Sequence, residues 1–157
     1  MKGAGKPDST MRRVRQALAF ILVLGMAGTG LELLLLRHTE DFWQLSPIVL
    51  IGAAGLVMVW HAVAPGRFSV RALQMVMGIF LLSGIVGVIL HYRGNVEWEL
   101  ERLPGTGGLE LFKAAMMGAT PSLAPGTMAV LGLLGLLFTY RHPALRREAA
   151  LETGSDP

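Results

Sequence analysis

Residues 72–92 read ALQMVMGIFLLSGIVGVILHY and contain no Asp, Glu, Lys or Arg. A helix needs about 20 mostly apolar residues to cross the hydrocarbon core of a bilayer, which is roughly 30 Å thick. This stretch has that length and that composition. We therefore predict a membrane-spanning helix from Ala72 to Tyr92.

Three other stretches have the same character, and together they give four predicted spans: Ala17 to Leu36, Ser46 to Ala64, Ala72 to Tyr92 and Leu123 to Tyr140. The whole chain of 157 residues is 52% hydrophobic and only 16% charged, which is too apolar for an ordinary soluble domain. The first stretch also suits a cleaved signal peptide, but its apolar run is longer than a signal-peptide core. We expect an all-α polytopic membrane protein, a four-transmembrane-helix bundle with a short extracytoplasmic helix or loop before the last span.

Basic residues are distributed unequally between the two sides of the predicted bundle. Lys and Arg in short loops resist translocation, so the more basic side stays in the cytoplasm. One side carries ten of the fourteen basic residues, and the other carries seven of the eleven acidic residues. We therefore predict both termini in the cytoplasm. The overall organisation resembles that of small bacterial inner-membrane proteins with four helices, so we expect a bacterial-type inner membrane.

The predicted transmembrane domain covers residues 13–142 and lies between two cytoplasmic tails. Residues 1–12 are rich in Gly, Lys, Pro and Ser and are predicted to be disordered, and residues 143–157 form the C-terminal tail. The net charge of +3 could suggest nucleic-acid binding. The basic residues are dispersed, however, with no basic helix and no interleaved aromatic residues, so we expect no nucleic-acid partner.

The entrance to the last span is interrupted by Pro121 and Pro125, which follow the apolar stretch 109–119. Proline lacks an amide hydrogen and clashes with the preceding turn, so it breaks a helix. One interpretation is an interfacial outer helix, a turn, and a span that begins near Pro125. The other is a discontinuous membrane helix whose free N-terminal amides face an anionic group. We favour the first.

Two stripes of small residues each end in an ionisable side chain. Positions separated by three and then four residues share one face of a helix. This spacing joins Gly25, Gly28 and Glu32 in the first span and Gly84, Gly87 and His91 in the third. Because small residues let helices approach closely, we hypothesise that the two stripes pack against each other.

Such packing would bring Glu32 near His91, about one turn inside the outer surface. A carboxylate in hydrocarbon is costly unless a cation or a donor meets it. Glu32, His38 and His91 are therefore our candidate proton or ion site. The alternative is a structural polar contact, in which Glu32 makes a packing hydrogen bond or reaches Arg37 or His38.

Acidic residues gather in the two outer segments, and we predict an outer acidic rim of Glu40, Asp41, Glu97 and Glu99. Zinc and copper prefer imidazole ligands, and calcium needs six or more oxygens from an ordered loop. No matching spacing occurs, so we interpret the rim as solvated and predict no metal. The absence of cysteine excludes disulfides and thiolate chemistry. His61 and His142 could ligate haem, but His142 lies beyond the helix end, so we expect no cofactor.

No nucleophile motif or phosphate-binding loop is present, and catalytic groups are scarce, so we predict no catalytic residue. The first hypothesis is a non-catalytic subunit or assembly partner of a membrane complex, bound to the lipid bilayer and to itself or another membrane protein. The alternative is a small proton- or ion-coupled carrier that uses Glu32 and His91. A membrane enzyme built on the outer histidines and carboxylates ranks third.

Overall fold

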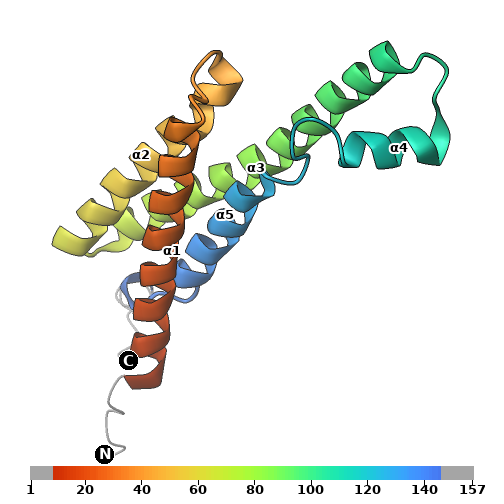
Figure 1. Ribbon diagram of the computed structural model, residues 1–157. Coiled ribbons are helices and arrows are strands. Elements are labelled where there is room, and N and C mark those ends of the chain that lie inside the picture. The colour runs from red at the N-terminus through yellow and green to blue at the C-terminus, as the bar shows by residue number, and fades with distance from the viewer. Residues whose placement is uncertain (1–8, 146–157) are drawn as a thin grey trace, which may run out of the picture.

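The computed structural model describes residues 9–145, and within them the backbone forms five α-helices and no strand. The helices are α1 (Ser9–Leu35), α2 (Phe42–Val63), α3 (Arg67–Arg102), α4 (Gly108–Met116) and α5 (Gly126–Thr139). Four of them, α1, α2, α3 and α5, form a bundle, and α4 lies beside the part of α3 that projects from it (Figure 1). The all-helical prediction is confirmed.

Within the described residues, α1, α2 and α3 are long and apolar enough to cross a membrane. The chain therefore has the character of a membrane protein. α5 is also apolar, but it has 14 residues and so measures about 21 Å at 1.5 Å per residue. The predicted span 123–140 is thus shorter as a helix than expected, because residues 123–125 form a turn at Pro125. A count of four spans stays a prediction.

Both of the first two helices begin earlier than predicted. α1 begins at Ser9, so residues 9–12 belong to a helix and not to a disordered tail, because Met and Arg continue a helix readily. The rest of the predicted tails, residues 1–8 and 146–157, lies outside the described residues. α2 begins at Phe42 because Asp41 caps it, accepting a hydrogen bond from the backbone N–H of Gln44 at 2.8 Å.

α3 continues ten residues beyond Tyr92 to Arg102. Its 36 residues correspond to about 54 Å, far more than a bilayer core requires. Residues 93–102 read RGNVEWELER and contain no proline, so nothing stops the helix where the apolar run ends. The chain between Tyr92 and the last predicted span therefore contains a helical hairpin, made by the end of α3 and by α4.

α5 packs closely against α3 on one side and against α1 on the other. Six of its 14 residues are buried: Met128, Leu131, Gly132, Gly135, Phe138 and Thr139. A Cβ atom placed on Gly132 would lie 2.7 Å from the backbone nitrogen of Leu81 and 2.7 Å from the backbone oxygen of Met77. The backbones of α3 and α5 are therefore in direct contact.

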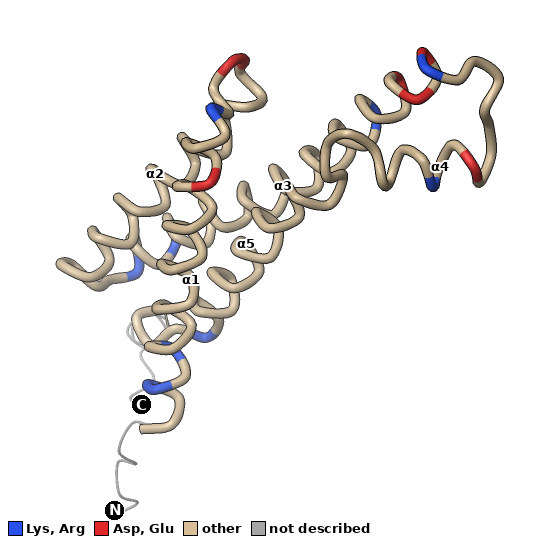
Figure 2. The backbone as a smooth tube through the Cα atoms, viewed as in Figure 1, with Lys and Arg blue, Asp and Glu red and all other residues tan. Residues whose placement is uncertain are grey.

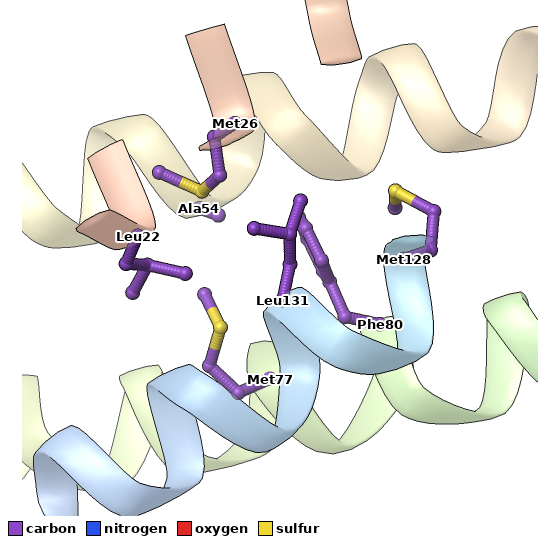
Figure 3. Close-up of a cluster of buried hydrophobic side chains, with 7 residues drawn as sticks. All are labelled: Leu22, Met26, Ala54, Met77, Phe80, Met128 and Leu131. Atoms are coloured by element: carbon purple, nitrogen blue, oxygen red, sulfur yellow. The ribbon is translucent and has the colours of Figure 1, made fainter. Parts of the chain in front are cut away.

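All four bundle helices contribute to one apolar core (Figure 3). Its buried members are Leu22, Met26, Ala54, Met77, Phe80, Met128 and Leu131. The contributions are unequal, since Ala54 is the one buried residue of α2. Ten of the 22 residues of α2 are exposed, so one face of this helix is uncovered by the rest of the described chain.

The two glycine stripes do not meet. On α3, Gly84 and Gly87 both lie against the first residues of α5. On α1, Gly25 faces Leu131 of α5, and the Cβ position of Gly28 has no neighbouring atom within 4 Å. The hypothesis that these stripes pack against each other is therefore wrong, because α5 occupies the space between α1 and α3.

Charged residues separate to the two ends of the bundle (Figure 2). One end holds the start of α1, the α2–α3 turn and the end of α5, and there the described residues include six arginines and no carboxylate. The opposite end carries four basic and seven acidic side chains among residues 9–145. We refer to these as the basic end and the acidic end.

Candidate functional site

Glu32 is exposed on α1, and its carboxylate makes no hydrogen bond or ion pair within residues 9–145. The expectation that it faces a neighbouring helix is wrong. α1 and α5 run in opposite directions, and Gly25 lies against Leu131. Glu32 lies seven residues after Gly25 on α1, whereas α5 extends only five residues from Leu131 back to its start at Gly126. Glu32 therefore lies beyond the start of α5, which does not cover it.

His38 and His91 are brought together, with their ring centroids 6.4 Å apart and their planes inclined by 47°. Arg37 adopts a left-handed φ of 51°, and the backbone N–H groups of Arg37 and His38 donate to the carbonyls of Leu34 and Leu33. This Schellman motif ends α1 and turns His38 toward α3. The Nδ1 atom of His91 is buried and has no hydrogen-bond partner among the described residues.

Asn95 is the centre of a buried polar network between α3 and the chain that follows α4. Its Nδ2 donates to the carbonyl of Ala115 at 2.9 Å, the carbonyl of Thr120 at 2.6 Å and the Oγ of Ser122 at 3.0 Å. Its Oδ1 accepts from the backbone N–H and the hydroxyl of Thr120. A Cβ atom on Gly118 would lie 2.7 Å from the Asn95 Cγ, so the turn fits tightly around this side chain.

Residues 117–125 contain no α-helix, and Pro121 and Pro125 both lie within this interruption. The backbone N–H groups of Gly126, Thr127 and Met128 donate to the carbonyls three residues earlier, at 2.9 to 3.1 Å. The first amides of α5 are therefore already bonded within the turn, which leaves them unavailable to an anion. This geometry disfavours the interpretation as an anion-binding discontinuous helix.

The residues of the predicted acidic rim have separate roles. Glu40 and Glu97 are exposed, and Asp41 is the N-cap of α2. Glu99 is buried and pairs with Arg102 at 3.0 Å, one turn further along α3. Within residues 9–145, no group of three or more His, Cys, Asp or Glu side chains is arranged to hold a metal ion.

At the basic end, His61 and His142 approach each other, with ring centroids 5.1 Å apart. The Nδ1 of His61 is 2.9 Å from the Oγ of Ser69, and that hydroxyl also bonds the carbonyls of Ala64 and Gly66. The α2–α3 turn and the end of α5 are thus held side by side. From the sequence, these two histidines were considered only as haem ligands.

Arg15 reaches across from α1 to the same end of α5, where its guanidinium donates to the carbonyls of Tyr140 and Arg141 at 3.2 and 3.0 Å. Partial burial lowers the pKa of His142, and the nearby charges of His61 and Arg15 lower it further. The basic end is therefore a set of structural contacts that favours the neutral form of His142.

Asn95 is the main residue whose role sequence reasoning missed. Nothing in its sequence pattern distinguishes it from its charged neighbours. A usable signal was its place on α3, an uncharged amide three residues after Tyr92 within a charged stretch. Asn can both donate and accept, which suits it to bond a turn whose amides and carbonyls are left unpaired.

No family model, no curated protein and no solved structure matches this chain.

Proposed function

We propose that this chain is a four-span protein of a bacterial-type inner membrane, with both termini in the cytoplasm. Support comes from the separation of charge, since arginine is concentrated at the end that holds the start of α1 and the end of α5 (Figure 2). α5 is short, but it packs inside the bundle, and the turn before it, which contains Leu123 and Ala124, extends its apolar length. It is the fourth span in this proposal.

Within the membrane, the protein acts as a non-catalytic subunit or assembly partner of a larger complex. The observation that carries this proposal is the uncovered face of α2. Ala54 is its one buried residue, and the Cβ positions of Gly52 and Gly55 have no neighbouring atom within 4 Å. Small residues one turn apart on an uncovered membrane helix let a second helix approach closely.

A substitution tests this assignment without disturbing the fold. Gly52→Leu adds a bulky side chain in open space, so the protomer should fold normally while association is lost. Gly78→Leu is the matched control, because Gly78 of α3 is also open. Association is measured by crosslinking in native membranes and by light scattering of the full chain purified in mild detergent.

The expected result is a complex, formed with itself or with another membrane protein, that Gly52→Leu weakens and Gly78→Leu leaves intact. A native chain that purifies as a lone monomer, and that crosslinks to nothing in its membrane, would refute the assignment.

A small proton- or ion-coupled carrier is the second candidate. It is favoured by one observation, the buried Nδ1 of His91 without a partner near the ring of His38. In reconstituted vesicles under a proton gradient, a carrier would show flux that His91→Gln and Glu32→Gln reduce. Equal flux in vesicles with and without the protein would exclude the proton-coupled version.

A further inference from the structure

α4 is a short amphipathic helix with one side bound to the protein and the other uncovered. Ala115 is fully buried, and its carbonyl accepts hydrogen bonds from Asn95 and Ser122. On the uncovered side, Leu109 is 67% exposed and Phe112 is 48% exposed. These two residues are three positions apart, so they lie on one face of the helix.

The exposed apolar surface continues along the chain from α4 into α5. Met117 is 81% exposed and Leu123 is 66% exposed. They are followed on α5 by the exposed side chains of Val130, Leu133 and Leu137. In the proposed topology, these α5 residues face lipid. The surface of α4 is thus continuous along the chain with the surface that the bundle presents to the bilayer.

One ring contact and one charged side chain indicate that α4 lies at the level of the lipid headgroups. The ring of Phe112 lies 5.9 Å from the ring of Tyr92, which marks the end of the apolar part of α3. Tyrosine prefers the membrane interface, where its ring meets apolar chains and its hydroxyl meets water. Lys113 borders the same exposed face, and a lysine there can bury its methylene stem while its ammonium stays among the phosphates.

From these observations we propose that the exposed face of α4, made by Leu109, Phe112 and Lys113, lies in the outer lipid leaflet at the boundary between headgroups and acyl chains. The binding partner of this face is phospholipid. The network centred on Asn95 holds α4 to α3 and so fixes the depth of the helix. This inference rests on the proposed membrane topology and adds to it a lipid-binding surface outside the spans.

The absence of cysteine makes a direct test possible, because any introduced thiol is unique. Single variants Phe112→Cys and Leu109→Cys of the full chain are spin-labelled and reconstituted in vesicles of phosphatidylcholine and phosphatidylglycerol. Collision with oxygen reports lipid, and collision with a water-soluble nickel chelate reports water. Glu97→Cys, at an exposed site on the projecting part of α3, is the aqueous control, and Leu133→Cys is the lipid control.

The expected result is high oxygen collision and low nickel collision at residues 109 and 112, close to the values at 133 and opposite to those at 97. Nickel collision at 109 and 112 equal to that at 97 overturns the proposal, because the face is then in water. Low collision with both reagents also overturns it, because protein then covers the face. If residue 133 shows no lipid contact, the proposed topology itself fails, and that outcome is distinct from failure at α4 alone.

Discussion

Gly132→Ala should loosen the contact between α3 and α5, which is the most extensive helix contact within residues 9–145. The new Cβ would lie 2.7 Å from two backbone atoms of α3, about 0.7 Å short of the 3.4 Å at which ordinary contact begins. Backbone atoms cannot rotate away as a side chain can, so the two helices must separate. Overpacking of this kind costs about 1–3 kcal/mol.

Two opposing terms make the comparison with other glycines informative. Alanine favours a helix over glycine by about 0.5–1 kcal/mol, and this gain accompanies every such substitution. At Gly78 no atom lies within 4 Å, so Gly78→Ala should be neutral or stabilising. At Gly25 the nearest atom is the Cδ2 of Leu131 at 2.6 Å, the end of a flexible side chain, so Gly25→Ala should cost less than Gly132→Ala.

The stabilities of these variants are compared by thermal unfolding in dodecyl maltoside, followed by the fluorescence of the three tryptophans. For a chain of this size, each kcal/mol shifts Tm by about 2–4 °C. The Tm of Gly132→Ala should therefore fall by several degrees, and that of Gly78→Ala should stay level or rise. Equal Tm values for Gly132→Ala and Gly78→Ala would show that α3 and α5 are not in backbone contact.

Three further predictions concern single side chains. Asn95→Ala leaves the backbone carbonyl, the backbone N–H and the hydroxyl of Thr120 without their partner. Each buried group left unpaired lowers the free energy of unfolding by about 1–3 kcal/mol, so limited proteolysis should cut residues 117–125 faster than in the native chain. Glycine adopts the left-handed conformation of residue 37 without the penalty of about 1–2 kcal/mol that an L-residue incurs, so Arg37→Gly should raise Tm; an unchanged or lower Tm would contradict the Schellman motif. Because the pKa of His142 is lowered in the folded state, the unfolded state binds more protons. The stabilising contribution of neutral His142 is therefore complete above pH 6.5 and is lost as the pH falls through the folded pKa, and His142→Gln should flatten this part of a curve of Tm against pH.

Helix content and charge asymmetry followed from local properties of the sequence. Long apolar runs and dispersed charge are visible residue by residue, and so is the interruption at Pro121 and Pro125. Helix ends were less predictable, because apolarity ends at Tyr92 while helix-forming residues continue to Arg102. The length of an apolar run indicates how much of a helix lies in the membrane, whereas the helix itself ends where its backbone hydrogen bonds end.

The candidate site depended on which helices are neighbours, and the sequence does not contain that information. Spacing placed Glu32 on the same stripe as Gly25, which was a correct statement about one helix. It did not reveal that α5 packs beside Gly25 but does not extend far enough to cover Glu32. The pairing of His38 with His91 likewise follows from the turn at Arg37, whose left-handed φ is unusual for a residue other than glycine.

The sequence by itself determined that the chain is helical, strongly apolar, free of cysteine and basic at one end, because each of these is a sum over local properties. Tertiary structure decided that α5 lies between α1 and α3, that Gly84 and Gly87 of α3 face α5 and that Asn95 holds α4 in place. These facts depend on contacts between residues distant along the chain. Such contacts are set by how side chains of four helices fill a common volume, and the periodicity of one helix cannot specify them.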